Sequence, residues 1–337
     1  MNLYCIESPD LNPYHNIALE EYLTDTVSDG EVILYIWRNR RTVVVGRNQN
    51  IFNECRCSLL KADGGFPARR LSGGGAVYHD EGNVNFSFIA RNKLYTVEKQ
   101  TAVILAAVQS LGLHAENSGR NDLTINGRKF SGNAFFSKKQ ASCHHGTLLL
   151  KTDTALLKKY LSVSKKKFEG KAVSSVQSRV CNLSDFDCLI TPAKMTAALI
   201  TAFGRLYGGD VQPYPAGRLC LPELEKAEKR FGSDAWIYGM NRVFTDSFER
   251  KFAWGLVSVC INVRSGIIAD CVIHTDSLET ELFPLAASKL SGRKFSSDET
   301  MQVFSELNRI VAGPQNKKTI LCDIRDMIIH EQKISAL

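Results

Sequence analysis

The sequence predicts an α+β (mixed α/β) fold built from two domains. Short β-branched runs and longer segments of helical periodicity are mixed along the chain without a regular strand–helix–strand alternation, which argues against a doubly wound parallel sheet. A length of 337 residues is enough for one large domain and a small one. Near residues 247–253 the pattern changes to a new hairpin and three helical segments. We therefore expect a large domain of residues 1–248 and a small α+β C-terminal domain of residues 253–337.

Helices of the large domain are predicted where apolar residues recur at helical spacing. Pro13 lies near the start of the first such segment, and Gly112 stops the second. The predicted helices cover residues 12–27, 98–111, 152–161 and 191–208.

Strands are predicted from short β-branched or alternating runs. Residues 31–37 and 42–46 are separated by the polar "RNRR", so we expect them to form a hairpin. Asn126 and Gly127 supply the tight turn of a second hairpin. Further strands are expected at residues 84–90 and 144–150, and a third hairpin at residues 254–275.

Composition excludes several classes of protein. The chain is 44% hydrophobic and 23% charged, as ordinary globular proteins are. Its apolar runs are shorter than the roughly 18–20 residues of a membrane span. The acidic Glu7 and Asp10 argue against an N-terminal targeting peptide. The ten cysteines contain no C-x-x-C pair, so we expect reduced thiols in the cytoplasm rather than zinc ligands or disulfides.

The net charge of +7 is compatible with nucleic acid, nucleotide phosphates or an acidic protein partner. The basic residues are scattered, and the one dense run, residues 164–171, lacks interleaved aromatic residues. We interpret this run as a solvated loop, and we expect neither nucleic acid nor a membrane among the partners.

The stretch "RRLSGGGAVYHDEGN" (residues 69–83) favours a ligand loop. Gly75 is followed by Ala-Val-Tyr, which excludes a P-loop, and the glycine spacing breaks the dinucleotide fingerprint. One remaining possibility is a nest of backbone N–H groups that binds an anion beside Arg69 or Arg70. The other is a tight structural turn with two surface arginines.

The stretch "SGRNDLTINGRKFSGNAFF" (residues 118–136) places Lys129 on the second predicted hairpin. A lysine that points from a hairpin into a cleft can pair with a carboxylate and a phosphate oxygen. The alternative is a solvated strand lysine. In "HHGTLLL" (residues 144–150), His144 and His145 point to opposite faces of a strand, so at most one of them faces the site. We expect one packed histidine and one exposed histidine.

Five motifs, in this order and spacing, resemble the lipoate–protein ligase A family of biotin/lipoate protein ligases. They are the three stretches above, "WRNRRTVVVGRNQN" (residues 37–50) and "SSVQSRVCNL" (residues 174–183). The resemblance covers essentially the whole chain. It implies a biotin/lipoate-ligase-type catalytic domain, related to class II synthetases, in residues 1–248, and an accessory domain in residues 253–337.

The resemblance implies two half-reactions. Lipoate and ATP, with Mg²⁺ held through the nucleotide phosphates, give lipoyl-adenylate and pyrophosphate. The lipoyl group then passes to a lysine on an acceptor domain of a 2-oxoacid dehydrogenase complex or on the glycine-cleavage H protein. This chemistry needs positioning and neutralisation of phosphate charge, and it needs no protein nucleophile.

The resemblance also implies site residues. Lys129 matches the family's lysine, which contacts both the lipoyl carbonyl and the phosphate, so it is the expected catalytic residue. Val44 and Gly75, with Lys129, are expected on the lipoate side. His79 and Asp80 then become residues that fix the loop rather than a catalytic pair. The expected nucleotide-binding residues are Arg70, Gly73, Gly74, Gly75, Ala76, Val77, Tyr78, Asn83, Asp122 and Lys129.

Two other classes of function remain open. The first is a transferase of the same fold, which uses a cysteine acyl-enzyme or a preformed acyl donor. Between Cys57 and Cys143 the chain has no cysteine, and we interpret Cys143 as a small residue at a strand start. The second is a non-catalytic binder of lipoyl-adenylate, in which loss of Lys129, Arg70 or the glycines would be expected; this chain keeps them.

Overall fold

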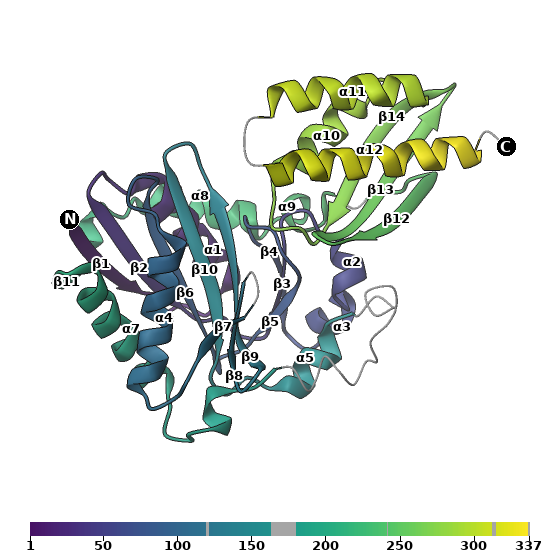
Figure 1. Cartoon of the computed structure of the whole chain (residues 1–337). Helices are drawn as coiled ribbons and strands as arrows, with labels where there is room; N and C mark the ends of the chain where they lie inside the picture. Colours follow the sequence, from purple (N-terminus) through teal and green to yellow (C-terminus); the bar gives the residue numbers. More distant parts are fainter. Residues whose placement is uncertain (119–120, 163–179, 241, 312–314, 336–337) are drawn as a thin grey trace. The chain divides into compact units, whose positions relative to one another are not determined.

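The structure is a computed structural model that describes residues 1–118, 121–162, 180–240, 242–311 and 315–335. The chain divides into two compact units (Figure 1). Unit 1 comprises Met1–Val45, Phe52–Leu71 and Ala76–Ile237, and unit 2 comprises Gly46–Ile51, Ser72–Gly75 and Tyr238–Leu337. The three consecutive glycines therefore group with the C-terminal part of the chain. The basic run at 164–171 and residues 174–179 of the fifth motif lie outside the described residues.

Unit 1 is built around a large mixed sheet. Its strands are β1 (Asn2–Glu7), β2 (Glu31–Trp37), β6 (Asn83–Arg91), β7 (Glu116–Ser118), β8 (Asp122–Ile125), β9 (Arg128–Ser137), β10 (Ala141–Leu149) and β11 (Val211–Pro213). They run in the order β11-β1-β2-β6-β10-β9-β8-β7. β1 pairs in parallel with β2 and β11, and the ladders from β2 to β7 are antiparallel. The predicted mixed α+β class is confirmed.

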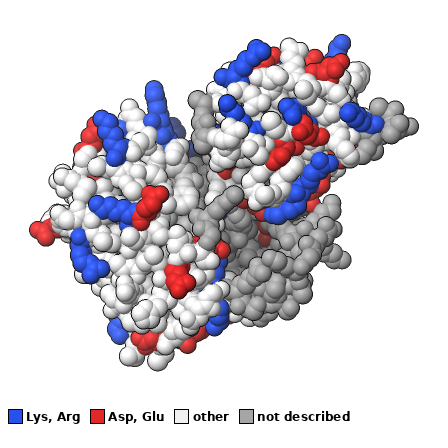
Figure 2. All heavy atoms as spheres, in the orientation of Figure 1, with Lys and Arg blue, Asp and Glu red and all other residues white. Residues whose placement is uncertain are grey.

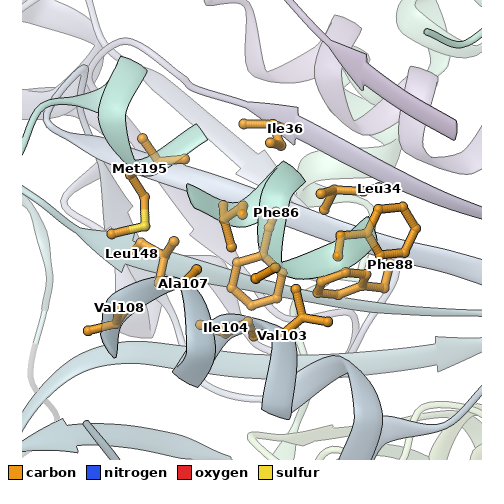
Figure 3. Close-up of a cluster of buried hydrophobic side chains, with 14 of the residues drawn as sticks. Leu34, Ile36, Phe86, Phe88, Val103, Ile104, Ala107, Val108, Leu148 and Met195 are labelled. Atoms are coloured by element: carbon orange, nitrogen blue, oxygen red, sulfur yellow. The ribbon is translucent and has the colours of Figure 1, made fainter. Parts of the chain in front are cut away.

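Helices bury both faces of this sheet. On one face, α4 (Val97–Ser110) and α7 (Pro192–Tyr207) cover the core that holds Phe86 and Phe88 (Figure 3). The other face packs against α1 (Pro13–Thr26) and α8 (Leu221–Phe231) in a second core. Asn12 and Thr191 cap α1 and α7, and the described part of unit 1 also contains α3 (Cys57–Ala62), α5 (Thr154–Tyr160) and α9 (Asp234–Tyr238). The predicted helices of the large domain are confirmed.

The predicted hairpin of residues 31–37 and 42–46 is wrong. β3 (Thr42–Val45) pairs with β4 (Phe66–Arg69) and β5 (Val77–His79) in a separate three-stranded sheet. Both edges of β2 are already taken, by β1 and β6, so no edge is left for β3. The hairpin of β8 and β9 does form, and its turn residues Asn126 and Gly127 have φ of 52° and 72°.

Unit 2 combines one antiparallel sheet with three helices. The strands are β12 (Asp246–Phe252), β13 (Gly255–Arg264) and β14 (Ile267–Thr275), and the helices are α10 (Leu282–Leu290), α11 (Ser297–Ile310) and α12 (Gln315–Ser335). Their apolar side chains form one core. The hairpin and the three helices were predicted, whereas β12, which carries several charged residues, was not. The assignment of residues 1–248 as the catalytic domain and of residues 253–337 as an accessory domain stays a prediction.

The surface is mixed in charge. On the face drawn in Figure 2, acidic and basic side chains are interspersed in each unit. Within the described residues, no helix is both long and apolar enough to span a bilayer.

Candidate functional site

Lys129 lies near the start of β9, in the hairpin formed by β8 and β9, here called the lysine hairpin. Its Nζ lies 2.7 Å from Asp122 Oδ1, and the two side chains are 36% and 37% exposed. A Cβ added to Gly132 would lie 3.0 Å from the same Nζ, so the missing side chain of Gly132 leaves room for the lysine. The structure therefore brings Lys129 and Asp122 together, and both side chains are partly exposed.

The first two glycines of residues Ser72–Gly75, here called the glycine loop, are needed for main-chain contacts within unit 2. A Cβ on Gly73 would lie 2.2 Å from the Ser277 carbonyl oxygen. Gly74, at φ +89°, donates its N–H to that same oxygen at 2.9 Å. A Cβ on Gly75, in contrast, would meet nothing within 4 Å. Packing thus explains Gly73 and Gly74, whereas no side chain or main chain among the described residues requires a glycine at position 75 on steric grounds.

Arg70 lies in unit 1 beside the small sheet. Its Nη1 donates to the Val44 carbonyl oxygen at 3.2 Å, and burial lowers the pKa of Arg70 to about 10, so the guanidinium stays charged at neutral pH. Val44 pairs with Val77, which Ala76 precedes and Tyr78 follows in the chain. Val44, Val77 and Tyr78 therefore share one sheet, and Arg70 and Ala76 lie directly beside its strands in the chain.

Arg69, in contrast to Arg70, is held by hydrogen bonds with Trp236 and Ile237. It is 1% exposed, and its Nη2 donates to the Ile237 carbonyl oxygen at 2.8 Å. Trp236 Nε1 donates in return to the Arg69 carbonyl oxygen at 2.9 Å. Because Arg69 and Arg70 are both buried, the alternative of two surface arginines is wrong.

His79 and Asp80 fix the loop that follows β5. Asp80 accepts hydrogen bonds from the Gly82 N–H at 3.0 Å and from the Asp153 N–H at 2.8 Å. His79 Nδ1 lies 3.1 Å from Asn39 Nδ2, and burial lowers the pKa of His79 to about 3. A neutral, buried histidine and a carboxylate bound to main-chain donors match the predicted structural role.

Asn83 begins β6 and is fully buried. Its N–H donates to the Asp80 carbonyl oxygen at 3.0 Å, and its Nδ2 donates to Asn85 Oδ1 at 2.8 Å. Among the described residues, its Oδ1 has no hydrogen-bond partner. Asn83 therefore retains one acceptor for a ligand or a water molecule.

His144 and His145 are both buried, so the expectation of one exposed histidine is wrong. As expected for neighbours on a strand, they point to opposite faces of the sheet. His144 lies 3.1 Å from Gln100 Oε1 on α4 and 2.9 Å from Asn133 Oδ1, and burial lowers the pKa of His144 to about 3. His145 Nδ1 lies 2.8 Å from Glu20 Oε1 on α1. Neither residue reaches solvent because β10 is an interior strand with a helix on each side.

Glu20 is a buried carboxylate that the sequence analysis missed. Its Oε1 accepts a hydrogen bond from Ser87 Oγ at 2.5 Å, and that hydroxyl accepts one from Trp37 Nε1 at 3.0 Å. The sequence could have shown that Glu20 is buried. It lies three residues after Ile17 and three before Leu23, on the apolar face of a predicted helix.

Cys143 lies in the same buried group as Glu20 and His145, with potential ligand atoms of the three within 4.8 Å of one another. Burial, together with the neighbouring Glu20 carboxylate, raises the pKa of the Cys143 thiol well above its usual value. This environment favours the neutral thiol, which is a poor nucleophile.

Residues 12–204 match the family model of the lipoyl protein ligase A/B catalytic domain, and residues 241–324 match that of the bacterial lipoate protein ligase C-terminus. A protein named lipoate-protein ligase A from Psychrobacter cryohalolentis is 36% identical over 341 residues, which cover 99% of this chain and 100% of the relative. One of the same name from Bdellovibrio bacteriovorus is 36% identical over 86% of this chain and 88% of its own length.

Two solved structures support the same fold. P. falciparum LipL1 in complex with lipoate has a TM-score of 0.84 and 30% identity, covering 98% of this chain and 100% of that one. A bipartite ligase from Thermoplasma acidophilum, solved in a study of that ligase and its E2 lipoyl domain, has a TM-score of 0.62 and 27% identity, covering 73% of this chain and 100% of its own.

Proposed function

The chain belongs to the lipoyl protein ligase A/B family, and from that premise we propose that it is an ATP-dependent lipoate–protein ligase. It joins lipoate to ATP with release of pyrophosphate. It then transfers the lipoyl group from the adenylate to a lysine of an acceptor domain. The Thermoplasma ligase and its E2 lipoyl domain support a lipoyl domain as the acceptor; the glycine-cleavage H protein is a second candidate.

The pairing of Lys129 with Asp122 is the observation that carries this proposal. During adenylation the lipoate carboxylate attacks the α-phosphate, and negative charge must be stabilised on phosphate oxygens. An ammonium group that is already held in place stabilises this charge without reorganising in the transition state. The Lys129 ammonium lies 2.7 Å from Asp122, and the lysine side chain is partly exposed. Arg70 supplies a second fixed positive charge for the nucleotide side.

Magnesium is proposed to enter with the nucleotide. Mg²⁺ usually binds one or two carboxylates together with substrate phosphates and water. Asp122 is the candidate ligand because its carboxylate is partly exposed and lies at the proposed catalytic residue, Lys129. The bound ion would neutralise phosphate charge, while Lys129 and Asp122 orient the reacting groups.

The cytoplasm is the proposed location of the protein. Its ten cysteines are free thiols, as is usual in that reducing compartment.

An acyl-enzyme on Cys143 is the main rival mechanism. The Cys143 side chain is fully buried, and its raised pKa favours the thiol. We therefore expect Cys143→Ser to retain lipoyl transfer within about threefold of the wild type, because no thiolate is needed. Transfer to a purified lipoyl domain, followed by mass spectrometry, measures this. Complete loss of transfer in a folded Cys143→Ser protein would instead support the acyl-enzyme.

Pyrophosphate release tests the ligase proposal directly. The protein is mixed with ATP, Mg²⁺ and lipoate in the absence of an acceptor, and pyrophosphate is measured with a coupled assay. A burst of about one pyrophosphate per protein is expected, followed by steady turnover when a lipoyl domain is added. No release, together with transfer from supplied lipoyl-adenylate or an acyl carrier, would identify a transferase. Binding of lipoyl-adenylate without either reaction would identify a non-catalytic binder.

A further inference from the structure

Lys129 reaches Asp122 because the ladder between β8 and β9 is irregular. In a regular strand, residues three apart point to opposite faces, as Lys129 and Gly132 then would. Yet a Cβ on Gly132 would lie 3.0 Å from Lys129 Nζ, and Asp122 is the partner of Gly132 across the ladder. The register shifts by one residue at Phe130, which forms a β-bulge. Bulges redirect side chains, and this one turns Lys129 toward Asp122.

A separate segment, formed by Val180 and Cys181, holds the main chain of Lys129, the residue next to the bulge. Cys181 N–H donates to the Lys129 carbonyl oxygen at 2.9 Å, and Val180 forms a parallel bridge with Lys129. β10 pairs with β9 only from Asn133 to Ser137 in the described ladder. Val180 and Cys181 therefore take the place of a neighbouring strand at Lys129.

Arg128 and Asp185 connect this segment to the lysine hairpin. Arg128 Nη2 donates to the Val180 carbonyl oxygen at 3.2 Å and lies 3.6 Å from Asp185 Oδ2. The same carboxylate oxygen accepts a hydrogen bond from Asn182 N–H at 3.0 Å. Arg128, which precedes Lys129, thus contacts Val180 directly and also contacts Asp185, which in turn accepts a hydrogen bond from the residue after Cys181.

The rest of the segment has its own anchor. Asn182 exchanges two hydrogen bonds with the main chain of Thr152, at 2.9 and 3.1 Å. Arg128 and Asp185, by contrast, are 44% and 42% exposed, and exposed ion pairs contribute little to stability. Loss of the ion pair should therefore leave the fold intact and loosen the segment locally, at Lys129.

We propose that Arg128 and Asp185 are positioning residues for the catalytic Lys129. Their ion pair holds Val180 and Cys181 against the Lys129 main chain. The held main chain keeps the bulge in the register that presents the ammonium group beside Asp122. The inference rests on the proposed ligase function.

The test uses Arg128→Ala and Asp185→Asn in the full-length protein. Asp185→Asn keeps an oxygen for the Asn182 N–H but removes the charge that attracts Arg128. The matched control is Arg91→Ala, because Arg91 Nε also donates to a carbonyl oxygen, that of Val27, at 2.8 Å and lies 3.9 Å from an aspartate, Asp29.

We expect kcat for pyrophosphate release to fall about tenfold in each variant, since displacing a catalytic group by a fraction of an ångström has effects of this size. The KM values for lipoate and ATP and the urea midpoint should match those of the control. The double variant should lose no more than Arg128→Ala alone, because Arg128→Ala already removes the ion pair that Asp185→Asn breaks. Arg128→Lys should recover part of the loss.

A second readout does not depend on activity. The Cys181 amide is expected to exchange with deuterium about tenfold faster in Arg128→Ala than in Arg91→Ala, measured by NMR under native conditions. If Arg128→Ala resembles the control in kcat, or if kcat falls without faster exchange, the inference is overturned while the ligase function stands. A wild type that releases no pyrophosphate would overturn the proposed function, and equal exchange in Arg128→Ala and Arg91→Ala would then refute the contact as well.

Discussion

The glycine loop and the lysine hairpin carry the two clearest motifs of the sequence, and they are constrained in opposite ways. In the glycine loop the main chain is constrained, since Gly73 lies against the Ser277 carbonyl and Gly74 donates to it. In the lysine hairpin a side chain is constrained, since Lys129 occupies the room beside Gly132. A substitution in the first should therefore act on the folding of unit 2, and a substitution in the second should act on the reaction.

The largest effect is expected for Lys129→Ala. Removing the ammonium group should lower pyrophosphate release by about a thousandfold or more, because charge on the phosphate is no longer stabilised. The urea midpoint should stay close to that of the wild type, since the Lys129 side chain is 36% exposed. Lys138→Ala, one residue beyond the other end of β9, serves as the control. Full adenylation by Lys129→Ala would refute the site assignment.

Gly73→Ala should have the next largest effect, and on stability. The new methyl group would lie 2.2 Å from a main-chain oxygen that cannot move like a side chain. We expect a loss of about 1–3 kcal/mol in the free energy of unfolding of unit 2. Urea denaturation followed by the fluorescence of Trp254, which lies in unit 2, measures it. Gly75→Ala is the control, because its methyl group would meet nothing. Equal stability of the two variants would mean that packing does not require Gly73.

Gly132→Ala should produce a smaller, purely functional effect. Its methyl group would lie 3.0 Å from Lys129 Nζ, the far end of a flexible side chain, so the lysine can shift by a few tenths of an ångström. We expect kcat for pyrophosphate release to fall about three- to tenfold, with unfolding unchanged within about 0.5 kcal/mol. A destabilised protein would show that the glycine serves packing, and the contrast with the glycine loop would then disappear.

Local sequence signals predicted much of this architecture because they act locally. Apolar periodicity predicted α1, with Pro13 near its start, and α7, and the Asn126-Gly127 pair predicted the turn of the lysine hairpin. The partner of β3 could not be predicted in the same way. It depends on which strands already occupy the edges of β2, and that is a property of the whole sheet.

The site was predicted unevenly for a related reason. Lys129 and Asp122 were both named, and the hairpin does bring them together. The bulge at Phe130 makes their contact possible, but it could not be predicted from the alternation of apolar and polar residues along a strand. One histidine of β10 was expected to be exposed, whereas helices cover both faces of the sheet and Gln100 and Glu20 provide a polar partner on each side.

The burial of histidines in unit 1 has a consequence for proton binding. His79 and His144 have pKa values lowered to about 3 by burial, against 6.5 in an unfolded chain. Below pH 6.5 these histidines bind protons in the unfolded state but not in the folded state. Their contribution to the free energy of unfolding is therefore fully present above pH 6.5 and is lost as the pH falls toward 3. At pH 5 each histidine should lower the free energy of unfolding by on the order of 1–2 kcal/mol. Urea midpoints of unit 1 at pH 7.5 and pH 5.0 measure the difference, and His144→Gln should reduce it. The interior that keeps these imidazoles neutral thereby makes unit 1 sensitive to mild acid.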